Sequence, residues 1–131
     1  AYYAVYDPIA KTLTYANAGH PPPRLKRCMD GTLHALDGER ALPLGIFPDT
    51  VYEDKKVQLV QGDQLIFYTD GITEAHSTKN QMYGTERLDK MLSNCGITAQ
   101  GLLDDVVANV AEFTSEAPPE DDRTMVVMKV R

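Results

Sequence analysis

The chain has 131 residues, 43% of them hydrophobic and 24% charged, and its formal net charge is −6. This length suits one domain with a working core, and the composition is ordinary for a soluble globular protein. The acidic balance argues against nucleic acid or an anionic membrane as a partner, because both attract cations. No apolar run approaches the roughly 20 residues that a membrane span needs, and no signal peptide opens the chain, so we expect a cytoplasmic protein.

The first part of the chain predicts strands joined by turns. Residues 1–7 and 12–17 are rich in Tyr, Val and Thr, and the link between them contains the turn formers Asp7 and Pro8. The prolines of NAGHPPP then exclude a central strand. Two further strands, at 23–28 and 32–37, flank an Asp-Gly pair that is typical of a hairpin.

The middle of the chain predicts an irregular loop followed by a second hairpin. The stretch ALPLGIFPD, residues 41–49, has the prolines of a loop and apolar side chains that we expect to anchor it. Strands at 55–60 and 63–70 then flank Gly62-Asp63, which predicts a hairpin between them. The unbroken run LIFY inside the second strand indicates burial on both faces.

Helical periodicity replaces the strand pattern after residue 76. Leu88, Met91, Leu92 and Cys95 share one helix face, with Gly96 as the expected C-terminal stop. A second helix is predicted from about Thr98, with its apolar face at residues 102, 103, 106, 107 and 110. A last strand is expected at 123–130. About seven strands, two helices and a closing strand indicate an α+β fold.

The two cysteines and the first residue each carry a prediction. Cys28 and Cys95 are far apart, with no CxxC spacing and no nearby histidine pairs, so reduced cytosolic thiols are expected. The sequence begins without Met inside a predicted strand. We therefore expect a fragment of a longer protein, although a removed tag would leave the same sign.

The predicted strand at 63–70 ends in Thr69-Asp70-Gly71, which has two interpretations. An Asp-Gly pair after a strand is more often a turn than a ligand. The segment Glu120-Asp121-Asp122, just before the last strand, is likewise typical of a solvated acidic loop. If the two strands bring these ends together, however, converging carboxylates repel unless a cation neutralises them. Carboxylate oxygens favour Mg²⁺ or Mn²⁺, which can activate a water for attack on phosphorus.

The order of motifs resembles a known family. TLTYANAGHPPPRL, LPLGIF, GDQLIFYTDGITEA, MYGTERL and EDDRTMVVMKV follow one another as in the metal-dependent PPM serine/threonine protein phosphatases, and the bacterial SpoIIE/RsbU group is the most similar branch. The resemblance covers residues 1–131 and implies the C-terminal portion of one phosphatase domain, part of an α/β/β/α sandwich. It also implies two metal ions, a metal-activated water, and a phosphoserine or phosphothreonine substrate of the anti-sigma-factor-antagonist type, in stress or sporulation signalling.

The resemblance carries over to particular residues. Asp70 of YTDG and Asp121 of DDRT match metal ligands of the family, and Asp122 matches a position next to the metals. The resemblance places Gly71, Thr73, Glu74 and Thr124 around the ligands or in the turn that carries Asp70. Asn17, Gly19 and His20 of NAGH match a characteristic loop without an assigned chemical role, for which a structural turn held by His20 is the favoured interpretation.

The departure from the family pattern leads to three further expectations. Family members carry an upstream GDxSGHG-like segment whose Asp bridges the two metals, and these 131 residues contain none. Both ions should therefore bind much more weakly here, and this chain alone should be inactive although its parent is a phosphatase. Uncovered sheet edges and apolar surface should favour dimerisation or strand exchange.

Two other functions stay open on the sequence alone. One is a non-catalytic, phosphatase-like module that binds a partner in a signalling assembly. The other, a Ca²⁺-binding β domain, is disfavoured because no D-x-D-x-D-G loop with a terminal Glu is present. The sequence does not determine the phosphoprotein, the parent's sensory domains or the oligomeric state.

Overall fold

The strands of the computed structural model form two antiparallel sheets, and the structure describes residues 1–37 and 42–131. The three-stranded sheet has the order β1 (Tyr2–Asp7), β2 (Thr12–Asn17), β5 (Lys55–Gln58). The four-stranded sheet has the order β4 (Leu33–Ala35), β3 (Arg24–Lys26), β6 (Gln64–Tyr68), β7 (Met125–Lys129). The helices are α1 (Asp70–Thr73), α2 (Gly84–Met91) and α3 (Ala99–Phe113). The predicted α+β class is confirmed.

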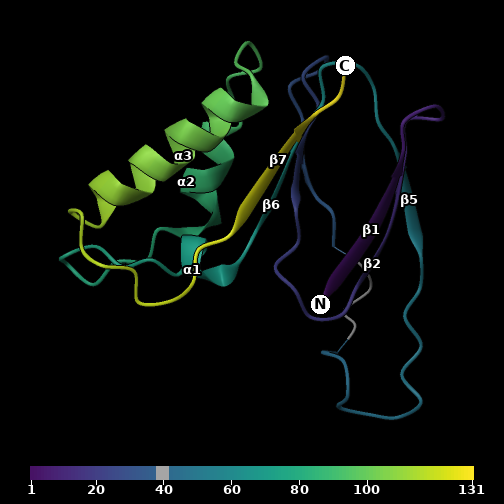
Figure 1. Cartoon of the computed structure of the whole chain (residues 1–131), viewed down its shortest axis with the longest axis horizontal. Helices are drawn as coiled ribbons and strands as arrows, with labels where there is room; N and C mark the ends of the chain where they lie inside the picture. The colour runs from purple at the N-terminus through teal and green to yellow at the C-terminus, as the bar shows by residue number, and fades with distance from the viewer. Residues whose placement is uncertain (38–41) are drawn as a thin grey trace.

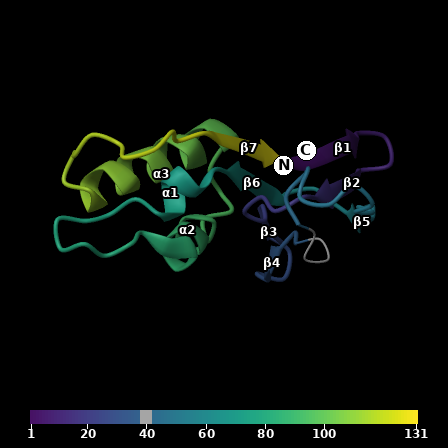
Figure 2. The same ribbon diagram turned by 90° about the horizontal axis from the view of Figure 1, so that it is seen from below.

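The four-stranded sheet lies between the helices and the three-stranded sheet, as Figures 1 and 2 show. Strand β6 is therefore covered on both faces, as its apolar run predicts. Leu65 belongs to the apolar cluster between the sheets, whereas the next residue, Ile66, belongs to the cluster under the helices. Both side chains are completely buried. The alternation of the strand thus divides two consecutive apolar residues between two cores.

Helix α3 follows the sequence prediction closely. The Thr98 side chain accepts a hydrogen bond from the Gly101 amide at 3.0 Å, which caps the first turn. Leu102, Val106 and Val110 recur with helical period and are buried against the sheet. Three of the five residues predicted on the apolar face are therefore the ones that pack, whereas Val107, predicted on the same face, is 55% exposed.

The predicted hairpin between 55–60 and 63–70 is wrong. Strand β5 pairs with β2 in one sheet, whereas β6 pairs with β3 and β7 in the other. Between them Asp63 is completely buried, and its carboxylate accepts the Val60 amide at 2.9 Å and the guanidinium of Arg27. Gly62-Asp63 therefore marks the crossing from one sheet to the other, which a local turn signal cannot distinguish from a hairpin. The hairpin at Asp30-Gly31 is confirmed by the pairing of β3 with β4.

The first predicted helix ends earlier than its periodicity indicates. Helix α2 stops at Met91, with Leu92 as its C-cap, so Cys95 does not extend its face and Gly96 is not its stop. The expectation of reduced thiols is also wrong, because Cys28 and Cys95 form a disulfide with a Cα–Cα distance of 5.8 Å. The two residues are 67 positions apart in sequence. Only the packing of the helices on the sheet brings them together.

Other details also differ from the sequence prediction. Six strands, not about seven, precede the helices in the described part of the chain, and the unexpected helix α1 begins at Asp70. Residue 41 of the predicted loop lies outside the described residues. In the rest of that loop, Leu44, Ile46 and Phe47 are 55–62% exposed, so they do not anchor it here. None of the helices in 1–37 and 42–131 has the length and apolar content needed to cross a membrane.

Truncation of Leu65 or of Ile66 should destabilise the domain. We expect Leu65→Ala and Ile66→Ala each to lower the free energy of unfolding by about 2–5 kcal/mol, because each leaves a cavity in a different core. Val126→Ala, at a position 57% exposed, should change it by no more than about 0.5 kcal/mol. Urea denaturation followed by circular dichroism measures all three. Equal effects of the three substitutions would contradict the central position of β6.

Candidate functional site

The candidate site forms where β6 ends and β7 begins. The two strands are antiparallel and their last paired residues are Tyr68 and Met125. Immediately beyond this pair, the Thr69 amide donates to the Thr124 carbonyl at 3.0 Å, and the Thr124 amide donates to the Thr69 hydroxyl at 3.0 Å. These two hydrogen bonds therefore hold the segment after β6 against the segment before β7 at the point where both leave the sheet.

Gly71 provides a second point of contact between the two segments. A Cβ atom at this position would lie 2.5 Å from the Asp122 carbonyl oxygen, so only glycine fits without displacing the backbone. The Thr69 hydroxyl donates to the same carbonyl at 3.0 Å, and the Arg123 Nε donates to the Gly71 carbonyl at 3.2 Å. The close approach is visible in Figure 1, where the segment leading into β7 passes beside α1.

Asp70 and Asp121, the two predicted metal ligands, are carried on these two segments. Asp70 is the first residue of α1 and is exposed, and its Oδ1 accepts the Gly71 amide at 3.1 Å. Asp121 is also exposed, and its Oδ1 accepts the Asp122 amide at 2.7 Å. The structure thus brings the two acidic segments into contact, as the sequence predicts. The roles of the two carboxylates as ligands stay predictions.

The neighbouring predicted residues lie within the same contact region. The Glu74 amide donates to the Asp70 carbonyl at 2.8 Å and caps the C-terminus of α1, while the Thr73 hydroxyl lies 3.4 Å from that carbonyl. Asp122 is exposed, and its backbone carbonyl accepts a hydrogen bond from the Thr69 hydroxyl. In this structure these residues shape the backbone around Asp70.

A small cavity adjoins the two segments and contains residues that the sequence did not single out. Its volume is about 100 Å³, and it is lined by Gly71, Glu74, Ala75, His76, Glu120 and Asp121. The His76 Nδ1 is buried without a hydrogen bond and lies 3.4 Å from a carboxylate oxygen of Glu120. His76 stands in a polar stretch of the sequence with no periodic or motif signal, so only the packing reveals its position.

Thr69 and Arg123 were also missed, although both belong to the quoted motifs YTDG and DDRT. Their contacts join segments that are more than 50 residues apart in the chain. A local motif indicates that such residues matter but not what they bind. The motifs in the sequence could therefore have indicated that Thr69 and Arg123 matter, but only the tertiary structure shows which groups they bind.

The NAGH loop is a separate turn whose conformation depends on Asn17. Its side-chain amide donates to the His20 carbonyl at 2.9 Å and accepts the His20 amide at 2.8 Å. Gly19 has a φ of +74°, and a Cβ there would lie 2.8 Å from the Pro43 side chain. The His20 ring packs near the ring of Tyr2, with its Nδ1 2.8 Å from the Pro21 carbonyl. Asn17 and Gly19 therefore have direct structural roles, and His20 supplies mainly backbone groups to the turn.

The residues of the two segments have the chemical type of ligand that a divalent metal needs, but too few of them are placed together to hold one. Carboxylate oxygens are the donors that Mg²⁺ and Mn²⁺ prefer, and the two segments carry five carboxylates. Those residues are Asp70, Glu74, Glu120, Asp121 and Asp122. Within 1–37 and 42–131, however, no group of three or more His, Cys, Asp or Glu side chains is placed to hold an ion. The described residues by themselves therefore do not form a complete metal centre.

Comparison with known proteins gives a consistent result. The family model of stage II sporulation protein E (SpoIIE) matches residues 1–131. The chain is 28% identical over 130 residues to phosphoserine phosphatase RsbU of Bacillus subtilis, and 27% identical over 127 residues to Protein IcfG of Synechocystis. The phosphatase domain of SpoIIE from Bacillus subtilis, presoaked with Mn, superposes with a TM-score of 0.73 at 21% identity. The fold is therefore that of a SpoIIE-type phosphatase domain.

The chain spans only part of each of these proteins. It is covered to 98% by RsbU and 97% by IcfG but represents 38% and 20% of their lengths. The structural match covers 99% of this chain and 56% of the SpoIIE chain. All three relatives thus contain substantial sequence outside the matched region.

The contact at Gly71 can be tested by adding one methyl group. We expect Gly71→Ala to lower the free energy of unfolding by about 1–3 kcal/mol, because the new Cβ clashes with the Asp122 carbonyl. Gly96→Ala is the matched control, since the nearest atom to its Cβ would be 3.4 Å away. Urea denaturation compares the two. If Gly71→Ala costs no more than the control, the two segments are not in contact.

Proposed function

Because this chain belongs to the stage II sporulation protein E (SpoIIE) family, we propose that it is the C-terminal portion of a single phosphatase domain. The parent protein removes phosphate from phosphoserine or phosphothreonine on a regulatory protein. One observation carries the proposal: β6 and β7 join the YTDG and DDRT segments, which hold Asp70 and Asp121, at one end of the sheet. The alignment with RsbU, named a phosphoserine phosphatase, supports the same reaction class.

In this proposal Asp70 and Asp121 hold Mg²⁺ or Mn²⁺ together with ligands from the rest of the parent. The ions would supply a water of lowered pKa and neutralise charge on the phosphate. Thr69, Gly71 and Thr124 set the spacing of the two acidic segments, because their backbone contacts leave little freedom at the base of each. The substrate is of the anti-sigma-factor-antagonist type, which the resemblance to the RsbU group implies.

The incomplete ligand set leads us to propose that these 131 residues alone do not catalyse the reaction. Two divalent ions carry four positive charges, whereas Asp70 and Asp121 together carry two negative ones. Among the described residues, no third His, Cys, Asp or Glu side chain completes a group that could hold an ion. The rest of the site would come from another part of the parent.

Metal titration tests the incomplete site directly. We expect isothermal titration calorimetry of the chain with Mn²⁺ to give no binding at micromolar concentrations, because the charge of the ligands is insufficient. Micromolar binding that disappears in Asp70→Asn but persists in Asp105→Asn would contradict this expectation. Asp105 is a suitable control because it is exposed on α3 and belongs to neither of the two acidic segments.

Phosphatase activity of the parent tests the function itself. Asp70→Asn in the full-length parent should lower phosphate release from its phosphoprotein by at least about 100-fold, because the amide removes a charged ligand. Asp105→Asn should leave the rate unchanged. Full activity in Asp70→Asn would exclude the proposed ligand role.

A non-catalytic module that binds a partner is the second candidate function. The exposed apolar side chains favour it, since Tyr3 and Val5 on β1 are 71% and 51% exposed on the outer face of the three-stranded sheet. A parent protein that binds its phosphoprotein without releasing phosphate, at any Mn²⁺ concentration, would establish this alternative in place of the enzyme.

The same exposed surface leads us to propose that the isolated chain self-associates. Strands β1 and β5 are the edges of one sheet, and β4 and β7 are the edges of the other. Light scattering should show a mass that rises with concentration, and Val5→Lys should reduce the rise. Ile9→Lys, in the turn after β1, is the control. A constant monomer mass at high concentration would contradict the proposal.

A further inference from the structure

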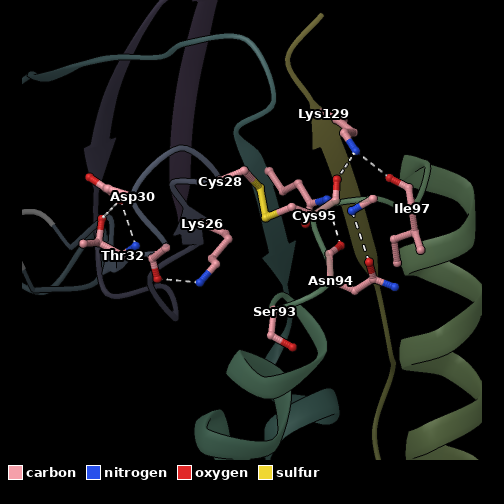
Figure 3. Close-up of a disulfide and its surroundings, with 12 residues drawn as sticks. Lys26, Cys28, Asp30, Thr32, Ser93, Asn94, Cys95, Ile97 and Lys129 are labelled. Carbon is pink, nitrogen blue, oxygen red and sulfur yellow. Dashed lines mark hydrogen bonds between the residues drawn. A yellow bond between two sulfur atoms is a disulfide. The ribbon is translucent and has the colours of Figure 1, made fainter.

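The disulfide joins two layers of the molecule. Cys28 lies in the turn between β3 and β4, and Cys95 lies in the connection between α2 and α3. Figure 3 shows the bond bridging these two segments beside β6 and β7. The chain has two cysteines, and this disulfide contains both of them. The bond therefore links the edge hairpin of the four-stranded sheet to the helical layer.

The segment around Cys95 is also held without the disulfide. The Lys129 ammonium, on β7, donates to the carbonyls of Cys95 at 2.6 Å and Ile97 at 2.7 Å, as Figure 3 shows. The side-chain amide of Gln64, on β6, donates to the Asn94 carbonyl at 3.2 Å. Three hydrogen bonds from the sheet therefore hold the backbone on both sides of this cysteine. Two of them have a charged donor and are correspondingly strong.

The segment around Cys28 is held to the same end of β6. Arg27, the preceding residue, forms an ion pair with the buried carboxylate of Asp63. The pairing of β3 with β6 places Lys26 opposite Gln64. Each cysteine is thus fixed to one end of β6 by contacts that do not involve sulfur. Two thiols held in this way would remain within reach of each other after the bond opens, which gives them a high effective concentration for closing it again.

Both cysteines are partly exposed, so a small thiol can reach the bond. We infer that the Cys28–Cys95 disulfide is a reversible redox clamp on the connection between α2 and α3, which small thiols open without unfolding the domain. A glutathione thiolate attacks one sulfur, forms a mixed disulfide and releases the other cysteine as a thiolate. A second glutathione thiolate then attacks the glutathione sulfur of this mixed disulfide, which breaks its bond to the protein and releases the remaining cysteine as a thiolate. The protein gains two electrons and two protons as two thiols, and glutathione leaves as its disulfide.

The expected consequence is local. Opening the clamp removes one restraint from residues 93–98 and from the turn at 28–32, so their backbone amides open more often. The hydrogen bonds from Lys129 and Gln64 still keep the connection near the sheet, and β6 and β7 stay paired. The clamp lies near the end of the β6–β7 pair where Gln64 is opposite Lys129. Asp70 and Asp121 lie beyond the opposite end, where Tyr68 is opposite Met125. The inference is therefore independent of the proposed phosphatase function.

Redox titration tests the inference. The chain is equilibrated with mixtures of reduced and oxidised glutathione, free thiols are alkylated, and mass spectrometry measures the disulfide fraction. We expect one two-electron transition that is the same from either direction, with unchanged far-ultraviolet circular dichroism. Hydrogen exchange should rise at 93–98 and 28–32 in the reduced form and remain slow in β6. Absence of the disulfide under oxidising conditions, or loss of the circular dichroism signal on reduction, would overturn the inference.

A substitution of Lys129 tests the preorganisation. Lys129→Met removes both ammonium hydrogen bonds but keeps an apolar stem, and it should shift the equilibrium toward the dithiol by about tenfold or more. Lys56→Met, at an exposed position on β5, should leave the equilibrium unchanged. If the two variants had the same ratio of disulfide to dithiol, Lys129 would not preorganise the two thiols, and that part of the inference would be wrong. The hydrogen-exchange comparison of the unsubstituted chain decides the inference if Lys129→Met does not fold.

Discussion

The pairing of β6 with β7 is the constraint on which the rest of this structure depends. The two strands are antiparallel from Gln64 opposite Lys129 to Tyr68 opposite Met125. One end of this pair fixes where the two acidic segments emerge, and the other end supplies the side chains that hold the disulfide connection. The strands are far apart in sequence, so neither end exists until the pair has formed.

Burial on both faces fixes the position of β6. Leu65 packs between the sheets and Ile66 packs under the helices, so a shift of β6 by one residue would exchange the two cores. The register is therefore strongly specified. Because Asp70 follows β6 by two residues, the same register determines where its carboxylate emerges beside the segment that carries Asp121.

The chemical consequence is a site that is positioned but not complete. The Thr69 hydroxyl donates to the Asp122 carbonyl, and Gly71 lies close to the same carbonyl. These contacts hold the two acidic segments together and do not depend on a metal ion. Among the described residues, no group of three or more His, Cys, Asp or Glu side chains is placed to hold an ion. A scaffold that fixes two acidic segments side by side is consistent with our proposal that the remaining residues of the site come from elsewhere in the parent.

The sequence by itself determined the properties that depend on local pattern. These are the α+β class, the helical period of the buried residues of α3 and the burial of the LIFY run. Tertiary structure decided the properties that depend on partners distant in the chain. Gly62-Asp63 is a crossing between sheets because Asp63 binds Arg27, and Gly71 is required because a distant carbonyl approaches it. Cys28 and Cys95 are joined because the helices pack on the sheet, and no spacing in the sequence encodes that approach.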